Sequence, residues 1–164
     1  MGDRTMSTLK VDSLVEKTSG NGVHIPGHVV QVQSVRGNFS GDVSTSSTSY
    51  AEVHSTLRNT FTPKYSNSII HIEYFTSSYG WSTDYIYFQL RGDGSALEST
   101  NDYFRNKSQA SVEMSATIYL EVPSWGTTSK IISPYYKSSG AATVFANWSG
   151  TAQIAYVKVT EIAQ

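Results

Sequence analysis

The longest regular pattern of apolar and polar positions in the chain covers residues 112–122. Every second residue of this run is apolar: Val112, Met114, Ala116, Ile118, Leu120 and Val122. Successive side chains of a strand point to opposite faces, so this spacing predicts a long strand with one buried face; on a helix the same residues would be scattered around the circumference. Pro123 ends the run because proline cannot donate to a sheet ladder. We therefore expect residues 112–122 to form a central strand of an all-β domain.

Shorter runs of the same kind predict the other strands. They cover residues 28–35, 50–61, 67–76, 83–91, 95–98, 130–137, 142–148 and 153–162, with loops expected at 37–49 and 99–110. Both faces of the run 67–76 carry apolar residues, so this strand is expected inside its sheet. Gly92-Asp93-Gly94 is a strong hairpin signal. Short strands separated by turns, without a helix of two or more turns, predict an antiparallel β-sandwich or jelly roll.

Residues 1–27 differ from the rest and are expected to form an N-terminal arm and hinge, with the jelly-roll domain at 28–164. The apolar residues available for attachment are Leu9, Val11, Leu14 and Val15, too few to form a core alone. The Ser-Gly-Asn-Gly run at 19–22 ends any regular element and supplies the hinge. We expect the arm to become ordered on a partner chain; the alternative is a frayed terminus.

Composition and charge exclude several function classes. Charged residues make up 15% of the 164 residues and the net charge is −1, which gives no electrostatic reason to bind nucleic acid or an anionic membrane. No segment approaches the roughly 20 apolar residues of a membrane span, and the N-terminus is not expected to be a signal peptide because it has no apolar core. The chain has no cysteine, so neither a disulfide framework nor a thiolate metal site is expected.

The residues that could carry catalytic or metal chemistry form no constellation. His24 and His28 are separated by Ile25-Pro26-Gly27, which argues against a helical pair of metal ligands. Glu113 and Glu121 share a strand face but would lie about 27 Å apart at roughly 3.4 Å per residue, too far for paired acid and base catalysis. A P-loop and a nucleophile elbow are both lacking. We expect no enzymatic activity, no cofactor and no metal.

Aromatic residues in the expected loops are candidates for surface recognition: Tyr79, Trp81, Tyr103, Phe104 and Trp125. Aromatic rings anchor protein interfaces and stack on the faces of sugars. They also cap the open ends of a sandwich core. The sequence leaves these three interpretations open: core cap, subunit interface and glycan contact.

The order of several short motifs resembles small structural proteins of bacteriophages, especially marine and cyanobacterial phages. STLKVDSL at 7–14 leads through a Gly-rich hinge to IPGHVVQ at 25–31, and FTPKYSNSII at 61–70, LRGDG at 90–94 and VKVTEI at 157–162 follow in the same order. The resemblance covers nearly the whole chain and carries no catalytic residues. It implies a virion protein of the tail-fibre or head-decoration kind with a trimeric jelly roll.

The resemblance and the residue patterns together imply a non-enzymatic virion structural protein assembled in the host cytoplasm. The expected role is a homotrimeric tail fibre or fibre-like component that its arm attaches to other virion proteins of the capsid or tail. A host-surface glycan is a further candidate partner. The alternatives are a capsid decoration or cement protein that stabilises the head, a glycan-binding module, or a glycan-cleaving enzyme, which would need the paired carboxylates that the sequence does not place.

Overall fold

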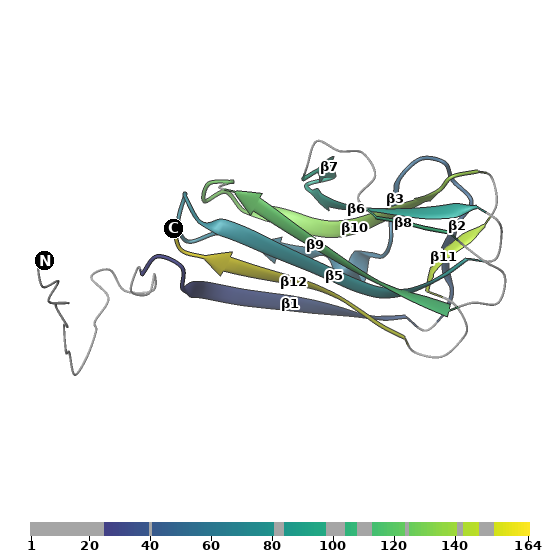
Figure 1. The fold of residues 1–164 in the computed structure, drawn as a ribbon, viewed down its shortest axis with the longest axis horizontal. Coiled ribbons are helices and arrows are strands. Elements are labelled where there is room, and N and C mark those ends of the chain that lie inside the picture. The colour runs from purple at the N-terminus through teal and green to yellow at the C-terminus, as the bar shows by residue number, and fades with distance from the viewer. Residues whose placement is uncertain are drawn as a thin grey trace, which may run out of the picture.

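The structure is a computed structural model, and it describes residues 25–39, 41–80, 84–97, 104–107, 113–123, 125–140, 143–147 and 153–164. Within these ranges the chain forms strands and a single 3₁₀ turn, η1 (Figure 1). Their bounds are β1 (Val29–Phe39), β2 (Val43–Thr45), β3 (Ala51–Glu52), η1 (Ser55–Leu57), β4 (Asn59–Phe61), β5 (Ile69–Gly80), β6 (Tyr85–Gly92), β7 (Ser95–Ala96), β8 (Phe104–Lys107), β9 (Glu113–Pro123), β10 (Lys130–Ser138), β11 (Val144–Asn147) and β12 (Gln153–Ile162).

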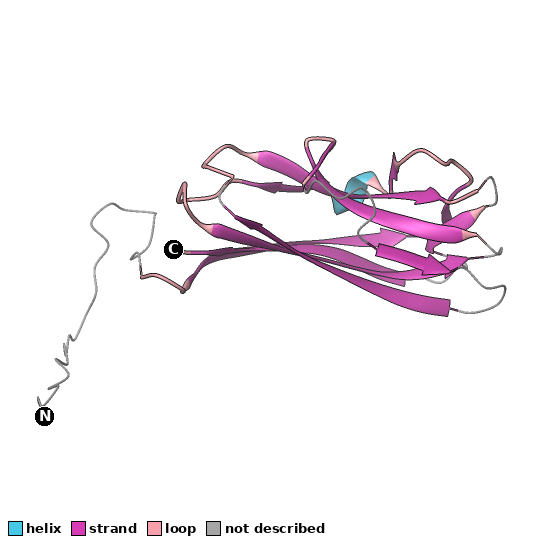
Figure 2. Ribbon diagram, turned by 45° about the horizontal axis from the view of Figure 1, so that its top comes forward, coloured by secondary structure: helices cyan, strands magenta, loops and turns pink. Residues whose placement is uncertain are grey.

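The strands form two antiparallel sheets, which lie as two layers in Figure 2. In the first, sheet I, the order is β1-β12-β5-β9. β11 pairs with the last residues of β5, and β2 pairs with β11. In the second, sheet II, β10 and β6 form the centre. The outer edge of β10 pairs with β4 and β3, and that of β6 with β8 and β7.

The connectivity is that of a jelly roll. If β3 with β4, and β7 with β8, each count as one interrupted strand, and the short strands β2 and β11 are left out, the eight main strands in chain order are arranged 1-8-3-6 in sheet I and 2-7-4-5 in sheet II. This eight-stranded arrangement of two packed sheets defines the jelly-roll architecture. The predicted all-β sandwich is therefore confirmed.

The strand β9 has the predicted alternation but not the predicted position. Its inward residues Ala116, Ile118, Leu120 and Val122 are buried, and the residues between them are exposed. Among the described residues β9 pairs with β5 alone, so it is an edge strand and the expectation of a central strand is wrong. The central strand is β5, which lies between β12 and β9. Alternation reports which face of a strand is buried, and it says nothing about the partners on its two edges.

Two expected loops contain strands, and one expected strand is interrupted. The region 99–110 includes β8, and the region 37–49 includes the end of β1 and all of β2. The region 50–61 is divided into β3, η1 and β4. This division leaves Ser133 and Pro134 of β10 without a ladder partner on that edge. The carbonyl of Pro134 accepts from the N–H of Val53 on the same edge. The proline nitrogen therefore faces the interruption between β3 and β4, where no ladder hydrogen bond would need its missing N–H.

The predicted hairpin turn is confirmed at the end of β6. Gly92 pairs with Ser95, and the two residues between them have positive φ, 51° for Asp93 and 78° for Gly94. Two central residues with positive φ define a type I′ turn, which matches the right-handed twist of the strands it joins.

The core lies between the sheets and is filled by aromatic and branched side chains. Those that are fully buried include Leu57, Phe61, Ile70, Ile72, Tyr74, Ile86, Phe88, Leu90, Ile132 and Val157. Tyr74 of sheet I meets Phe88 of sheet II edge to face, with ring centroids 5.8 Å apart. Edge-to-face contact is a favoured aromatic geometry, so this pair joins the two sheets near the centre of the core.

Glu161 is a fully buried carboxylate on the inner side of β12. It accepts hydrogen bonds from the backbone N–H groups of Lys64 and Tyr65, each at 2.9 Å, from Oγ of Ser68 at 2.7 Å and from Nε2 of Gln31 at 2.7 Å. Burial by itself would raise the pKa of this carboxyl, but the donors outweigh it and hold the pKa below its ordinary value of 4.5. The charge ties the β4–β5 loop to β12 and β1.

The described chain begins beside the C-terminus (Figure 1). The N–H of Gly27 donates to the carbonyl of Ala163 at 2.7 Å, and the N–H of Ala163 donates to the carbonyl of His28 at 3.0 Å. We call this end of the sandwich the entry end. It also holds the start of β5 and the end of β9, because Ile69 pairs with both Ile162 and Pro123.

Candidate interaction surfaces

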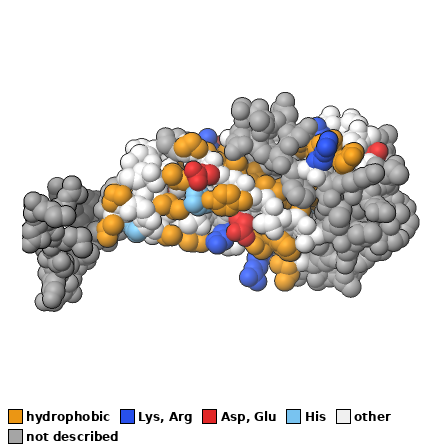
Figure 3. All heavy atoms as spheres, in the orientation of Figure 1, with side chains coloured by type: hydrophobic (Ala, Val, Ile, Leu, Met, Phe, Trp, Pro, Cys, Tyr) orange, Lys and Arg blue, Asp and Glu red, His pale blue; other side chains and the backbone are white. Residues whose placement is uncertain are grey.

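The outer face of sheet I is a broad surface with apolar side chains open to solvent (Figure 3). Val32, Tyr119 and Ile154 are 54%, 58% and 55% exposed. Strand register arranges the outward residues of this face in cross-strand rows: Val32-Thr160-His71-Glu121, Ser34-Lys158-Glu73-Tyr119 and Arg36-Tyr156-Phe75-Thr117. Large side chains of such exposure, on three of the four adjacent strands of this face, mark a candidate interaction surface.

Polar and aromatic contacts fix the middle of this face. Phe75 and Tyr156 stack with ring centroids 5.5 Å apart. The hydroxyl of Tyr156 donates to Glu73, and this hydrogen bond raises the pKa of Tyr156. His71 lies 3.2 Å from the carboxylate of Glu121 on the neighbouring strand. The surface is therefore ordered before any partner arrives.

The charges of this face are segregated between its two halves. Arg36 and Lys158 lie on β1 and β12, whereas Glu73 and Glu121 lie on β5 and β9. Opposite charges facing each other across an interface select a partner and its orientation. One half of the face is therefore complementary in charge to the other half of a second copy.

The outer face of sheet II carries a tyrosine–cation layer made of Tyr50, Tyr85, Tyr87, Arg91, Arg105, Tyr135 and Lys137. The Arg91 guanidinium carbon lies 5.1 Å from the ring centroid of Tyr50 and 4.6 Å from that of Tyr135. The Nζ of Lys137 lies 4.6 Å from Tyr50 and 5.0 Å from Tyr87. Cation–π contacts of this kind are worth about 0.5–1 kcal/mol each at exposed sites.

The tyrosine–cation layer covers polar groups of the strands beneath it. Gln89 and Ser133 are buried although they point outward from sheet II. Arg91 donates from Nε to the side-chain oxygen of Gln89 at 2.7 Å. On the outer face of sheet II, cations cover aromatic rings, although Ile131 is exposed there. The outer face of sheet I exposes more large apolar side chains, including Val32, Tyr119 and Ile154.

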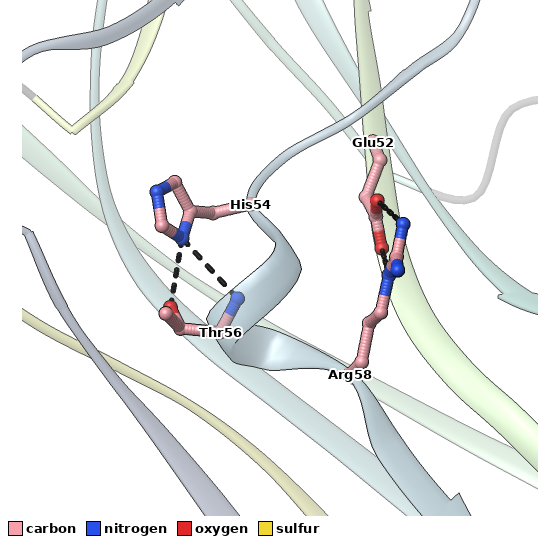
Figure 4. Close-up of polar contacts among 4 residues, drawn as sticks. All are labelled: Glu52, His54, Thr56 and Arg58. Carbon is pink, nitrogen blue, oxygen red and sulfur yellow. Dashed lines mark hydrogen bonds and ion pairs between the residues drawn. The ribbon is translucent and has the colours of Figure 1, made fainter.

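A hollow of about 340 Å³ adjoins this layer, lined by Glu52, Arg58, Asp93, Gly94, Ile131, Ser133 and Tyr135. Figure 4 shows the pair at one side: Arg58 donates from Nε and Nη2 to the two carboxylate oxygens of Glu52, both at 2.7 Å. The hydrogen bond from Arg58 lowers the pKa of Glu52. The side chain of His54 accepts from the N–H of Thr56 at 3.2 Å and caps η1, which sets the position of Arg58 at the end of that turn.

The candidate attachment residues of the arm, Leu9, Val11, Leu14 and Val15, lie outside the described residues. The candidate recognition residues Trp81 and Tyr103 do so as well. Their predicted roles therefore stay predictions.

The remaining candidate aromatics are not gathered at one place. Trp125 lies at the entry end, packed against the core, with its ring 6.2 Å from Phe61 and Nζ of Lys130 5.5 Å from its centroid. This favours the core-cap interpretation for Trp125. Tyr79 and Phe104 belong to β5 and β8, so the expectation that they lie in loops is wrong. Tyr79 pairs with β9 and β11 at the end opposite Trp125.

Histidines and carboxylates are not combined into a metal site in the part of the chain that the structure describes. His28 bonds through Nδ1 to the backbone of Ile25, and His54 caps η1. The same described ranges include no helix that is long and apolar enough to cross a membrane.

The tyrosine–cation layer and the hollow were not predicted. The run Tyr85, Tyr87, Gln89 shows which residues share the outer face of β6, and the same spacing places Ser133, Tyr135 and Lys137 on β10. The pairing of β6 with β10 brings the two runs together. A search for aromatic and cationic residues at alternate positions would have found the layer, but not which strands adjoin.

Comparisons with known proteins identify no family for the chain: no family model matches it, and no curated protein matches it. A solved chain of the capsid asymmetric unit of cyanophage Pam1 is similar at 18% identity and a TM-score of 0.44, over 94% of this chain and 98% of that one. A chain of infectious bursal disease virus, Gx strain, is similar at 10% identity and a TM-score of 0.34, over 94% of this chain and 45% of that one. Neither likeness assigns a function to this protein.

Proposed function

We propose that the protein is a non-enzymatic structural component of a virion that assembles as a homotrimer through the outer face of sheet I. The observation that carries this proposal is the set of open apolar side chains on an ordered sheet face, with Val32, Tyr119 and Ile154 all more than half exposed. A surface of this kind in a folded domain calls for a protein partner. The motif order shared with small phage structural proteins supports a virion as the place of assembly.

The segregated charges support self-association through this face, and a closed ring of three subunits is the arrangement that we propose. In a cyclic trimer each contact joins two different patches, so the half with Arg36 and Lys158 meets the half with Glu73 and Glu121 of the next subunit. Each contact then pairs cations with carboxylates.

On the particle, we favour a capsid decoration or cement role over a tail fibre. The jelly roll is complete within one chain, since each of its two sheets is formed from that chain's own strands. Such a subunit needs no strand from a neighbour for its core, and it can be added to a shell that has already formed. The N-terminal arm, which precedes the entry end, would attach it to other virion proteins.

The oligomer is tested by sedimentation velocity at micromolar concentration. The wild-type protein is expected to be trimeric, and Tyr119→Lys is expected to be monomeric, because it removes an exposed ring and places a cation opposite Arg36 and Lys158 of the next subunit. Ile131→Lys is the matched control, since Ile131 is an exposed apolar residue, 42% exposed, on the outer face of sheet II. It should remain trimeric. A monomeric wild-type protein would contradict the proposed interface. A stable dimer would be consistent with an interface between copies but would exclude a threefold ring.

The arm is tested by deleting residues 1–22. The truncated protein is expected to be folded and trimeric but absent from particles, because three arms per trimer raise the effective concentration of the attachment contacts. The measurement is the number of copies of the truncated protein on particles that are assembled in the absence of the full-length protein. Electron microscopy of particles with the full-length protein shows where on the particle it is bound. If the truncated protein binds particles in normal amounts, the residues that attach the protein to the particle lie in the jelly-roll domain.

A further inference from the structure

The hollow on the outer face of sheet II has the dimensions of a small-ligand site. Its volume of about 340 Å³ is at the lower end of the roughly 300–1,000 Å³ range of ligand pockets. It opens on the face that points away from sheet I, so assembly through sheet I leaves it accessible. A ligand that binds here would have to be small, and one side of it would stay in contact with water.

The wall of the hollow combines an aromatic ring with an apolar side chain. The Arg91 guanidinium lies 4.6 Å from the ring centroid of Tyr135 and holds that ring in place. Ile131 lies four residues earlier on β10, about 13 Å away at roughly 3.4 Å per residue, and is 42% exposed. The ring of Tyr135 is a surface of the kind on which the C–H face of a sugar ring stacks, and Ile131 adds an apolar contact at the other end of the hollow.

The polar lining is fixed before a ligand binds. Glu52 and Arg58 hold each other through two parallel hydrogen bonds of 2.7 Å. The Asp93 carboxylate accepts from the N–H of Ile131 at 2.9 Å, which ties the β6–β7 turn to β10. Planar, pre-oriented donors and acceptors of this type suit adjacent hydroxyl groups on a ring.

The charged groups of the lining favour a neutral ligand over an anion. Two carboxylates, Glu52 and Asp93, and one guanidinium, Arg58, line the hollow. The neighbouring Arg91 stacks on Tyr135 and donates to Gln89 and to the carbonyl of Gly94, so these donors are already used. An anion would be repelled by the two carboxylates, whereas a neutral sugar can donate its hydroxyl groups to them.

We propose that this hollow binds one neutral pyranose ring, stacked on Tyr135, hydrogen-bonded by the Glu52–Arg58 pair and Asp93, and flanked by Ile131. This makes the outer face of sheet II a saccharide-binding surface. The inference is independent of the proposed place of the protein in a virion, since it uses only the residues around the hollow.

The test is an NMR titration of the full chain with methyl glucoside, methyl mannoside, methyl galactoside and N-acetylglucosamine, each to tens of millimolar. The Ile131 methyl and Tyr135 ring signals are expected to shift saturably with at least one of them, with a millimolar dissociation constant. Glucuronate should bind several-fold more weakly than the best neutral sugar. No saturable shift with any neutral sugar, or tighter binding of glucuronate, would overturn the proposal.

Variants separate the site from the rest of the face. Tyr135→Ala should weaken binding about tenfold, a loss of about 1.4 kcal/mol, and Tyr135→Phe should retain it because the ring remains. Tyr87→Ala is the matched control: it removes another ring of the same layer, one that does not line the hollow, and should leave affinity unchanged. If Tyr135→Ala does not fold, Asp93→Asn still tests the site. It keeps the turn, since asparagine tolerates positive φ, and should weaken binding several-fold; unchanged affinity would count against the proposal.

Discussion

Replacing Ile118 with aspartate is expected to lower the free energy of unfolding by about 4 kcal/mol. Ile118 is 6% exposed and points from β9 into the core. It pairs in register with Tyr74 of β5, one of the largest buried side chains. The substitution both removes a branched apolar group from the core and places a carboxylate there without a partner, so its two costs add.

The matched control for this substitution is Thr60→Asp. Thr60 lies on β4, and its side chain is exposed on the outer face of sheet II, away from the proposed subunit interface. A carboxylate there stays in water and is expected to change stability by less than about 1 kcal/mol. Urea unfolding of both variants, followed by tryptophan fluorescence, gives the comparison. Equal midpoints for the two variants would mean that Ile118 does not face the core.

The strands with regular alternation could be predicted from the sequence because side-chain alternation is a local property. The run 153–162 was expected as a strand and coincides with β12, and the run 130–137 differs from β10 by one residue. The strand β8 was missed because its four residues have no apolar alternation. Its strand structure comes from pairing with β6, a contact between segments distant in sequence.

Position within a sheet was harder to predict than strand identity. The interior place of β5 could be predicted because its two faces both carry apolar residues. The edge place of β9 could not, since an edge strand with one buried face has the same alternation as a central one. Which strands become neighbours depends on how the whole chain closes into two sheets.

The candidate surfaces were only partly accessible to sequence reasoning. Aromatic residues were expected to matter where they lie in loops, but Trp125 proves to be packed on the core. The hollow is formed by Glu52, Arg58, Asp93 and the strand β10, which are far apart along the chain. Their proximity follows from the pairing of β10 with β3, β4 and β6. The sequence of one chain does not show which of these strands pair or in what register.

Glu161→Gln is expected to lower the free energy of unfolding by about 3 kcal/mol at neutral pH. The amide has nearly the shape of the carboxylate, but its NH₂ group replaces an acceptor and faces N–H donors. Lys64, Tyr65 and Ser68 all donate to Oε1, so the NH₂ group takes the place of Oε2 and faces the Nε2 group of Gln31 and the N–H of Lys64, which both donate to Oε2 in the wild type. Asp42→Asn is the matched control, because Asp42 is an exposed carboxylate just before β2 and is not part of the proposed subunit interface. It should cost less than about 1 kcal/mol.

The pH dependence of this difference distinguishes a lost charge from lost packing. The pKa of Glu161 is lowered in the folded protein, since its hydrogen-bond donors outweigh burial. Its stabilisation is therefore fully present above the unfolded value and is lost as the pH falls through the folded pKa. Glu52, whose pKa is also lowered, titrates alike in both proteins and cancels in the comparison. Urea unfolding of wild type and Glu161→Gln from pH 7 downward should show the gap between them shrinking below pH 4.5, the ordinary pKa of the carboxyl. A gap that stays constant with pH would show that the charge of Glu161 does not stabilise the fold.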